Sequence, residues 1–286
     1  MIEFLYKINQ SFIEIKNVLV ALLKILIYTK FSLKKLTTSG DSFTFLANGP
    51  SLTSALEKMQ KDNIDFSNVM VSNYFNYSAL FDEIRPNFYI ICDPAFILQN
   101  EKNDAFFSSI FKKVCWKMTF FIPISYKKKM EVNVLRLNLE NPNILFHYYN
   151  SINLDGNSSL IHWFYKKGWG MPSPTTVAVA GVYQGIFMNY KKIQIAGIDL
   201  NMHQSIRVNS SNVLEIQEDH FYADEPHYRT FYKNVNSKTT FTSAEIFLIF
   251  HRMIASFDIL SKFAKKKNSK IINYSNESFL DQFIKK

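Results

Sequence analysis

Cysteine, glycine and proline are scarce in this sequence of 286 residues, and each shortage excludes a class of protein. The two cysteines, Cys92 and Cys115, both lie in apolar runs. We therefore expect core thiols in a reducing compartment, not a disulfide framework or a zinc site. Eight glycines and eight prolines are too few for a collagenous or linker-rich chain. Hydrophobic residues make up 47% and charged residues 20%, which indicates a globular chain of one large domain or two small ones.

Acidic residues are outnumbered, since 33 Lys and Arg against 24 Asp and Glu give a net charge of +9. The basic residues are scattered in pairs and triplets, and no known nucleic-acid-binding motif is present. We therefore expect no nucleic-acid partner. The positive charge suits an anionic membrane surface or a phosphorylated small molecule, and most of the lysines are expected to form solvated surface.

A long uninterrupted apolar run is also missing. The first 36 residues have helical periodicity without Pro or Gly, but the apolar run 18–28 is bounded by Lys16 and broken by Lys24. It is too short for a membrane-spanning helix. Glu3 and Glu14 sit early and no small-residue cleavage site follows, which argues against a signal peptide.

Residues 1–38 are instead predicted to form an N-terminal amphipathic helix that lies on a membrane surface. This predicts a cytoplasmic protein that is peripheral on the inner face of a bacterial cell membrane. The alternative is a helix packed on the protein's own core or in a homo-oligomer interface.

From residue 39 to 286, apolar strands alternate with helical stretches. Strands are predicted at 43–47, 68–72, 88–91, 118–123, 143–148, 193–196 and 270–274, and helices near 51–59, 176–189 and 242–264. The last helix opens with a capping box, Thr242-Ser-Ala-Glu245. Strands that are apolar throughout and alternate with helices predict an α/β fold with a mostly parallel sheet covered on both faces.

Short polar residues follow several of these strands, where ligands bind in a parallel sheet. The strand ends carry Asn48-Gly49-Pro50-Ser51, Asn73, Asp93, and Gly197-Ile198-Asp199. Gly49 would let the backbone approach a ligand, Pro50 would start a helix and Ser51 would cap it. The N–H groups behind Ser51 could then face a phosphate. The alternative is an ordinary strand-to-helix turn.

Three stretches together resemble a known family. They are Ala47-Asn-Gly-Pro-Ser-Leu52, Ala180-Gly181-Val182-Tyr183 and Ala196-Gly197-Ile198-Asp199. In their order and spacing they are similar to the motifs Gly-Asn-Gly-Pro-Ser-Leu, Ser-Gly-Val-Tyr and Ser-Gly-Ile-Asp of the bacterial sialyltransferases of glycosyltransferase family 42. They also resemble, more loosely, flagellin-glycosylating transferases. The likeness covers roughly residues 43–283.

The resemblance implies a modified Rossmann-type domain with a lid at about 201–241. It implies an inverting transfer of sialic acid or a related acidic sugar from a CMP donor, with no required metal or other cofactor. The acceptor would be a surface glycan such as lipooligosaccharide or capsule. By position, Asn48, Gly49, Ser51, Asn73 and the Gly181 backbone would hold the donor. Asp93 stands where the family usually has Asn, and Ala180 where it has Ser.

The catalytic residues differ from those of the family, whose general base is a His in a His-Ser-Lys context. Here the matching residues are Asn236-Ser237-Lys238. The stretch 218–228, EDHFYADEPHY, offers two other imidazoles, and we expect His220 and then His227 to act as the base. Tyr222 and Tyr228 would donate hydrogen bonds to the departing phosphate. The alternative is a solvated, charged loop.

Two further readings stay open. Asp199, His203, Asp219 and His220 could hold a metal in a nucleotide phosphohydrolase or pyrophosphate-transfer enzyme, although their spacing is irregular. Without the family's base, the protein could also be a non-catalytic nucleotide-sugar-binding partner in a membrane assembly. No Asp-x-Asp motif is present, which argues against a metal-dependent nucleotide-sugar transferase.

Overall fold

The body of the protein is built on one eight-stranded parallel sheet. The computed structural model describes residues 2–36, 40–218, 227–234 and 238–286. The strand order is β13-β12-β6-β1-β2-β3-β4-β5, and every neighbouring pair is parallel. The strands are β1 (Ser42–Leu46), β2 (Val69–Ser72), β3 (Phe88–Ile90), β4 (Met118–Pro123), β5 (Ile144–Tyr149), β6 (Lys192–Ala196), β12 (Lys270–Asn273) and β13 (Ile284–Lys285).

This architecture confirms the predicted α/β, Rossmann-type sheet. The chain leaves β1 toward β2 on one side, and β6 returns to the other side of β1. The carboxyl ends of β1, β2 and β6 therefore meet where the strand order reverses, which is where ligands bind in open α/β sheets.

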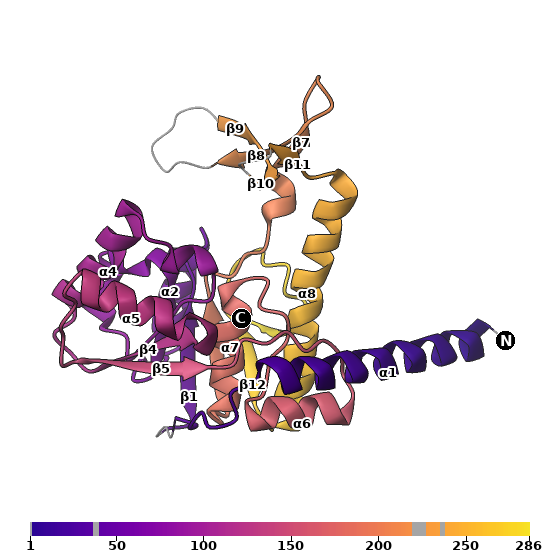
Figure 1. Ribbon diagram of the computed structural model, residues 1–286, viewed down its shortest axis with the longest axis horizontal. Coiled ribbons are helices and arrows are strands. Elements are labelled where there is room, and N and C mark those ends of the chain that lie inside the picture. Colours follow the sequence, from indigo (N-terminus) through magenta and orange to yellow (C-terminus); the bar gives the residue numbers. More distant parts are fainter. Residues whose placement is uncertain (1, 37–39, 219–226, 235–237) are drawn as a thin grey trace.

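Helices cover both faces of the sheet (Figure 1). One layer contains α1 (Ile2–Tyr28), α6 (Ser159–Lys167), α7 (Val177–Phe187) and α8 (Ser243–Lys266), and the other α2 (Leu52–Lys61), α3 (Leu80–Ile84), α4 (Glu101–Lys113) and α5 (Lys127–Arg136). Along β1, Phe43 and Phe45 enter the first core and Leu46 the second. Successive side chains of a strand point to opposite faces, so both faces of this strand are buried and its sequence is mostly apolar.

Four short 3₁₀ helices, η1 (Asn73–Tyr77), η2 (Pro94–Ile97), η3 (Ile124–Tyr126) and η4 (Met202–Ser205), follow strands of the sheet. After η4 the chain forms small β elements at one end of the molecule (Figure 1), in the segment 201–241 that is predicted to be a lid and is called the lid below. It contains an antiparallel sheet of β7 (Ile206–Val208), β8 (Leu214–Glu218) and β9 (His227–Thr230), and a hairpin of β10 (Tyr232–Asn234) and β11 (Thr239–Thr240). The sequence did not predict these strands, because they are short and polar.

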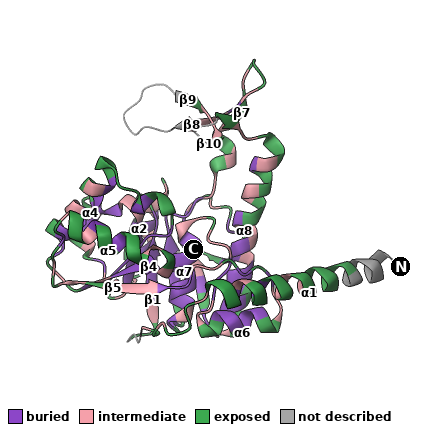
Figure 2. Cartoon of the chain, in the orientation of Figure 1, coloured by how far each residue is buried: buried purple, intermediate pink, exposed green. Residues whose placement is uncertain are grey.

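Helix α8 leads from the lid back into the body (Figure 1). Its predicted capping box is confirmed: Thr242 Oγ1 accepts from the Glu245 N–H at 3.3 Å, and Glu245 Oε2 accepts from the Thr242 N–H at 2.9 Å. Helix α1 lies at the other end, beside α6, and most of its described residues are exposed (Figure 2). Among the described residues, no helix has the length and hydropathy that crossing a bilayer requires.

Candidate functional site

The loops after β1 and β6 run side by side and form the floor of the candidate site. The Ala47 N–H donates to the Ala196 carbonyl and the Gly49 N–H to the Gly197 carbonyl, both at 2.9 Å. Gly197 has φ +71°, a left-handed conformation that favours glycine. A Cβ on Gly49 would overlap Asp199 Oδ2 and would lie 2.5 Å from the Gly197 carbonyl oxygen. Gly49 is therefore required by close packing of the two loops, not by an open approach to a ligand.

Asp199 occupies the start of α2. Its side chain is buried, and Oδ2 accepts from the Ser51 N–H at 3.2 Å. The expectation that Ser51 caps α2 with its own side chain is wrong, because Ser51 has helical backbone angles and makes no side-chain cap bond. The carboxylate of Asp199 does this instead. A phosphate at the same helix end would meet that negative charge, so the phosphate-facing role expected for this helix end is not supported.

Three unpartnered polar atoms belong to residues at these strand ends. Among the described residues, Asp199 Oδ1, Ser51 Oγ and Asn73 Oδ1 are buried and have no hydrogen-bond partner. Asn73, at the end of β2, has φ +52° and its carbonyl accepts from the Tyr89 hydroxyl. Exposed Asn48 joins the loops, because its Nδ2 donates to the Ser72 carbonyl at 3.1 Å. Carboxylate, amide and hydroxyl oxygens can accept from ribose or sugar hydroxyls.

The loop after β12 supports the Gly197–Asp199 turn. Ser275 Oγ accepts from the Ile198 N–H at 2.9 Å, and Ser278 Oγ donates to the Ile198 carbonyl at 2.6 Å. The Phe279 N–H donates to the Asp199 carbonyl at 3.0 Å. Sequence reasoning missed these residues. The signal that could have found them is the polar run 273–278, NYSNES, which follows the last long strand as the other polar stretches follow theirs.

Several predicted donor residues lie elsewhere or have structural contacts. Gly181 is inside α7, where a Cβ would overlap the Phe45 ring, so this glycine permits close helix–sheet packing. Asp93 follows β3, is exposed and accepts from the Ala95 N–H at 2.8 Å. Pro50 is exposed and lies just before α2.

The predicted catalytic residues all belong to the lid. His220 and Tyr222 lie outside the described residues, as do Asn236 and Ser237. His227 is the first residue of β9, and its backbone lies opposite that of Glu218 in the antiparallel pair of β8 and β9. Tyr228 stabilises the lid sheet: its hydroxyl bonds to Gln217 Oε1 at 3.0 Å, and the Arg207 guanidinium carbon lies 3.5 Å from its ring centroid.

An apolar pocket of about 230 Å³ adjoins the candidate site at the base of the lid. Leu200, directly after Asp199, lines it together with His203, Phe279 and residues of α8 such as Phe247 and Phe250. The ring of His203 packs edge-on against Phe279, with centroids 4.2 Å apart. An apolar pocket with a few polar groups beside a polar strand-end site is typical of substrate-binding regions.

Comparison with known proteins identifies no family for this chain. No family model matches it, and no curated protein matches it. A solved structure that is similar is the MAf glycosyltransferase from Magnetospirillum magneticum AMB-1, with a TM-score of 0.49 and 14% sequence identity. The alignment covers 91% of this chain and 35% of that one, so this chain spans about a third of the length of its structural neighbour. The resemblance to the family 42 sialyltransferases stays a prediction.

Proposed function

We propose that the protein is a glycosyltransferase that binds a nucleotide-sugar donor at the carboxyl ends of β1, β2 and β6. The observation that carries the proposal is that residues at these three neighbouring strand ends hold buried oxygen atoms without a partner among the described residues: Asp199 Oδ1, Ser51 Oγ and Asn73 Oδ1. Buried polar atoms without partners are rare in folded proteins and are explained when a ligand supplies the missing hydrogen bonds. Hydroxyl groups of a ribose or a sugar can supply them.

The donor is proposed to be a CMP-activated sialic or related acidic sugar, on the strength of the three sequence motifs. A carboxylate at the start of α2 disfavours an anionic group at that point, so the sugar or ribose hydroxyls would face Asp199. The apolar pocket behind Leu200 would accommodate the acceptor side of the reaction.

The general base is proposed to be an imidazole close to this site. His220 and His227 are the candidates from the sequence. His203 and His251 line the pocket behind Leu200, and His203 is the one that follows Asp199 closely in the chain. A positioned base contributes roughly 10²–10⁴-fold to a rate. Replacing the base by Ala should lower turnover by about that factor while nucleotide affinity stays nearly constant, and Asp199 becomes the candidate if all three single variants keep normal turnover.

Ligand-dependent melting temperature tests the proposal. Sugar conjugates of CMP, UDP and GDP are each added to the full chain, and the CMP conjugate should raise the melting temperature most, because a ligand that binds only the folded state stabilises it. Asp199→Asn and Asn48→Ala should each lower the affinity, Asp199→Asn by about tenfold or more. Asp258→Asn, an exposed carboxylate on α8, is the matched control. If no nucleotide sugar changes the melting temperature, the proposal is overturned.

A further inference from the structure

Two charged side chains of helix α1, Glu14 and Lys24, contact the body of the protein. From residue 12 to 28 the charged residues are Glu14, Lys16 and Lys24. Glu14 accepts from the N–H groups of Asn157 and Ser158, both at 3.1 Å, at the start of α6. Lys24 Nζ donates to the Asn153 carbonyl at 2.9 Å. Two of the three charges are therefore engaged on the inner side of the helix.

The outer side of α1 is consequently apolar apart from Lys16, which is exposed one turn after Phe12. Ala21 and Ile25 pack into the core, whereas large apolar side chains on the other side remain uncovered. Leu26 is 76% exposed and Phe12 is 67% exposed. The outer face consists of Phe12, Ile15, Leu19, Leu22, Leu23, Leu26 and Ile27. A continuous exposed apolar patch of this kind marks an interaction surface.

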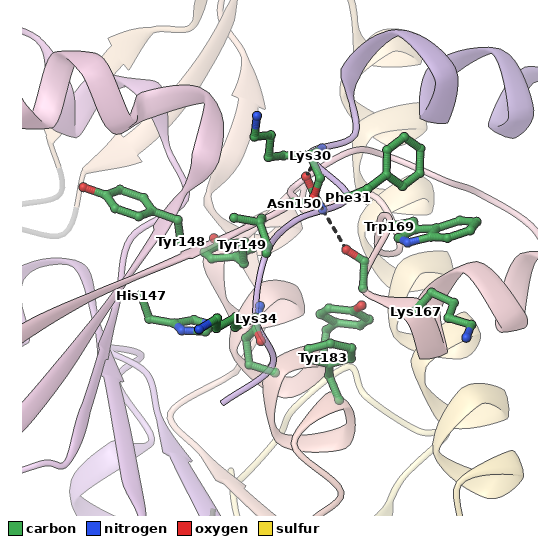
Figure 3. Close-up of a pocket in the computed structure, with 14 residues that line it drawn as sticks. Lys30, Phe31, Lys34, His147, Tyr148, Tyr149, Asn150, Lys167, Trp169 and Tyr183 are labelled. Atoms are coloured by element: carbon green, nitrogen blue, oxygen red, sulfur yellow. Dashed lines mark hydrogen bonds between the residues drawn. The ribbon is translucent and has the colours of Figure 1, made fainter. Parts of the chain in front are cut away.

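The outer face is held in a fixed position. Asn150, which is buried, accepts from the Lys30 N–H at 3.0 Å and donates to the carbonyls of Lys30 and Gly168. Thr29 Oγ1 donates to the Trp169 carbonyl at 2.8 Å. Figure 3 shows Asn150 beside Lys30 and Phe31 at this junction. The carboxyl end of α1 is thus attached to the body, and the outer face is presented by the folded protein.

Lysines and aromatic rings flank the outer face where α1 ends. Lys30, Lys34 and Lys167 are exposed and line one pocket with Phe31 and Trp169 (Figure 3). The Phe31 ring packs edge-on against Trp169, and exposed Trp163 of α6 packs against Trp169 as well. Aromatic residues and lysines beside an apolar helix face are the composition of segments that lie in a membrane interface.

We propose that the outer face of α1 binds in the plane of an anionic lipid bilayer, with Lys30, Lys34 and Lys167 facing the headgroups. Contacts of Glu14, Ala21, Lys24 and Ile25 with the body keep the inner side of α1 away from lipid. Charge complementarity favours lipid over a second copy of the chain. α6 contains no acidic residue and Glu14 is engaged, so lysines flank this surface and would face the lysines of another copy in a face-to-face pair, where like charges repel.

Co-sedimentation with vesicles tests the apolar contact. The full chain should bind vesicles of equimolar phosphatidylcholine and phosphatidylglycerol and should bind phosphatidylcholine alone much more weakly. The double variant Leu23→Ser/Leu26→Ser should weaken binding at least about tenfold, because two leucines no longer enter the bilayer. Val132→Ser/Leu135→Ser on α5 is the matched control, since these side chains are also exposed and apolar, and it should bind like the unmodified chain.

The charge contribution is tested with glutamine variants. Lys30→Gln, Lys34→Gln and Lys167→Gln should each weaken binding to the anionic vesicles about fivefold, and the effect should diminish with added salt. The control replaces Lys112, Lys128 and Lys129 of α4 and α5 by Gln. The proposal is overturned if the full chain ignores both vesicles. A second copy of the chain would cover the outer face if light scattering shows a dimer, if Leu23→Ser/Leu26→Ser dissociates this dimer, and if the chain binds neither vesicle. That result also overturns the proposal. Neither readout uses a nucleotide sugar, so the result is independent of the proposed enzymatic function.

Discussion

The strand-end loops of the body and the small sheets of the lid keep their shapes by different contacts. In the body, Gly49 and Gly197 bring two backbones together, and buried Asp199 bonds across 148 residues of sequence to Ser51. In the lid, Arg207, 51% exposed in its side chain, contacts Glu215 and the ring of Tyr228 at the surface. The candidate donor site is therefore shaped by the core, whereas the contacts of Arg207 in the lid lie at the surface and contribute little to global stability.

The largest expected effect is in the core beneath the sheet, at His162. Burial and then the nearby Lys266 lower the pKa of this imidazole to about 4, and its two nitrogens have no partner among the described residues. The unfolded chain takes up a proton near pH 6.5, whereas the folded protein does so near pH 4. Stability is thus fully present above pH 6.5 and falls by roughly 3 kcal/mol as the pH drops to about 4.

His162→Phe should remove this fall, which urea unfolding between pH 7 and pH 4 measures through the midpoint of the transition. His251→Phe, at an exposed position on α8, serves as the control and should keep the fall. An unchanged pH profile in His162→Phe would contradict the assignment of the effect to this residue.

Gly49→Ala should have the next largest effect. The added methyl overlaps Asp199 Oδ2, so the two loops must separate, at a cost of about 1–3 kcal/mol in unfolding free energy. Nucleotide-sugar affinity should fall as well. Thr53→Ala, an exposed position on α2, should change neither quantity. Normal stability in Gly49→Ala would show that the loops tolerate separation and that close core packing does not determine their shape.

Tyr228→Phe should have a smaller, local effect. It removes the hydrogen bond to Gln217 but keeps the ring under Arg207, which costs about 0.5–1.5 kcal/mol within the lid sheet. Amide hydrogen exchange should accelerate in β8 and β9 and stay constant in β1 and β6. Faster exchange in the body strands would mean that the lid and the body unfold together.

Glu245→Gln should produce the smallest effect. Hydrogen bonds from Lys233 and from the Thr242 backbone lower the pKa of this exposed carboxyl to about 2. Its contribution is present above about pH 4.5 and disappears as the pH falls toward 2. In the unmodified chain, the first turn of α8 should open slightly more often as the pH falls from 4.5 to 2. In the variant this opening should depend less on pH, which hydrogen exchange at the first amides of α8 measures. A steeper acid dependence in the variant would contradict this sign.

Much of the body could be predicted from local pattern. The strand 118–123 matches β4 in both bounds, and the capping box at Thr242 appears with both of its hydrogen bonds. These features depend on burial of consecutive residues or on contacts within one helical turn. They can therefore be predicted from residues that are close together in the sequence. The lid strands could not be found in this way, because half-exposed strands of two to five residues carry no clear alternation.

That Asn48, Ser51, Asn73 and Asp199 follow strands of a parallel sheet could be predicted from the sequence, because apolar strands and the polar residues after them are consecutive in the chain. Which of these residues meet depends on the order of the strands in the folded sheet. Placing β6 beside β1 puts Asp199 against Gly49 and lets it, rather than Ser51, cap α2. In the same way, docking on α6 turns Glu14 inward and leaves the outer face of α1 apolar. Partners so distant in sequence are selected by strand order and helix packing, which no local pattern specifies.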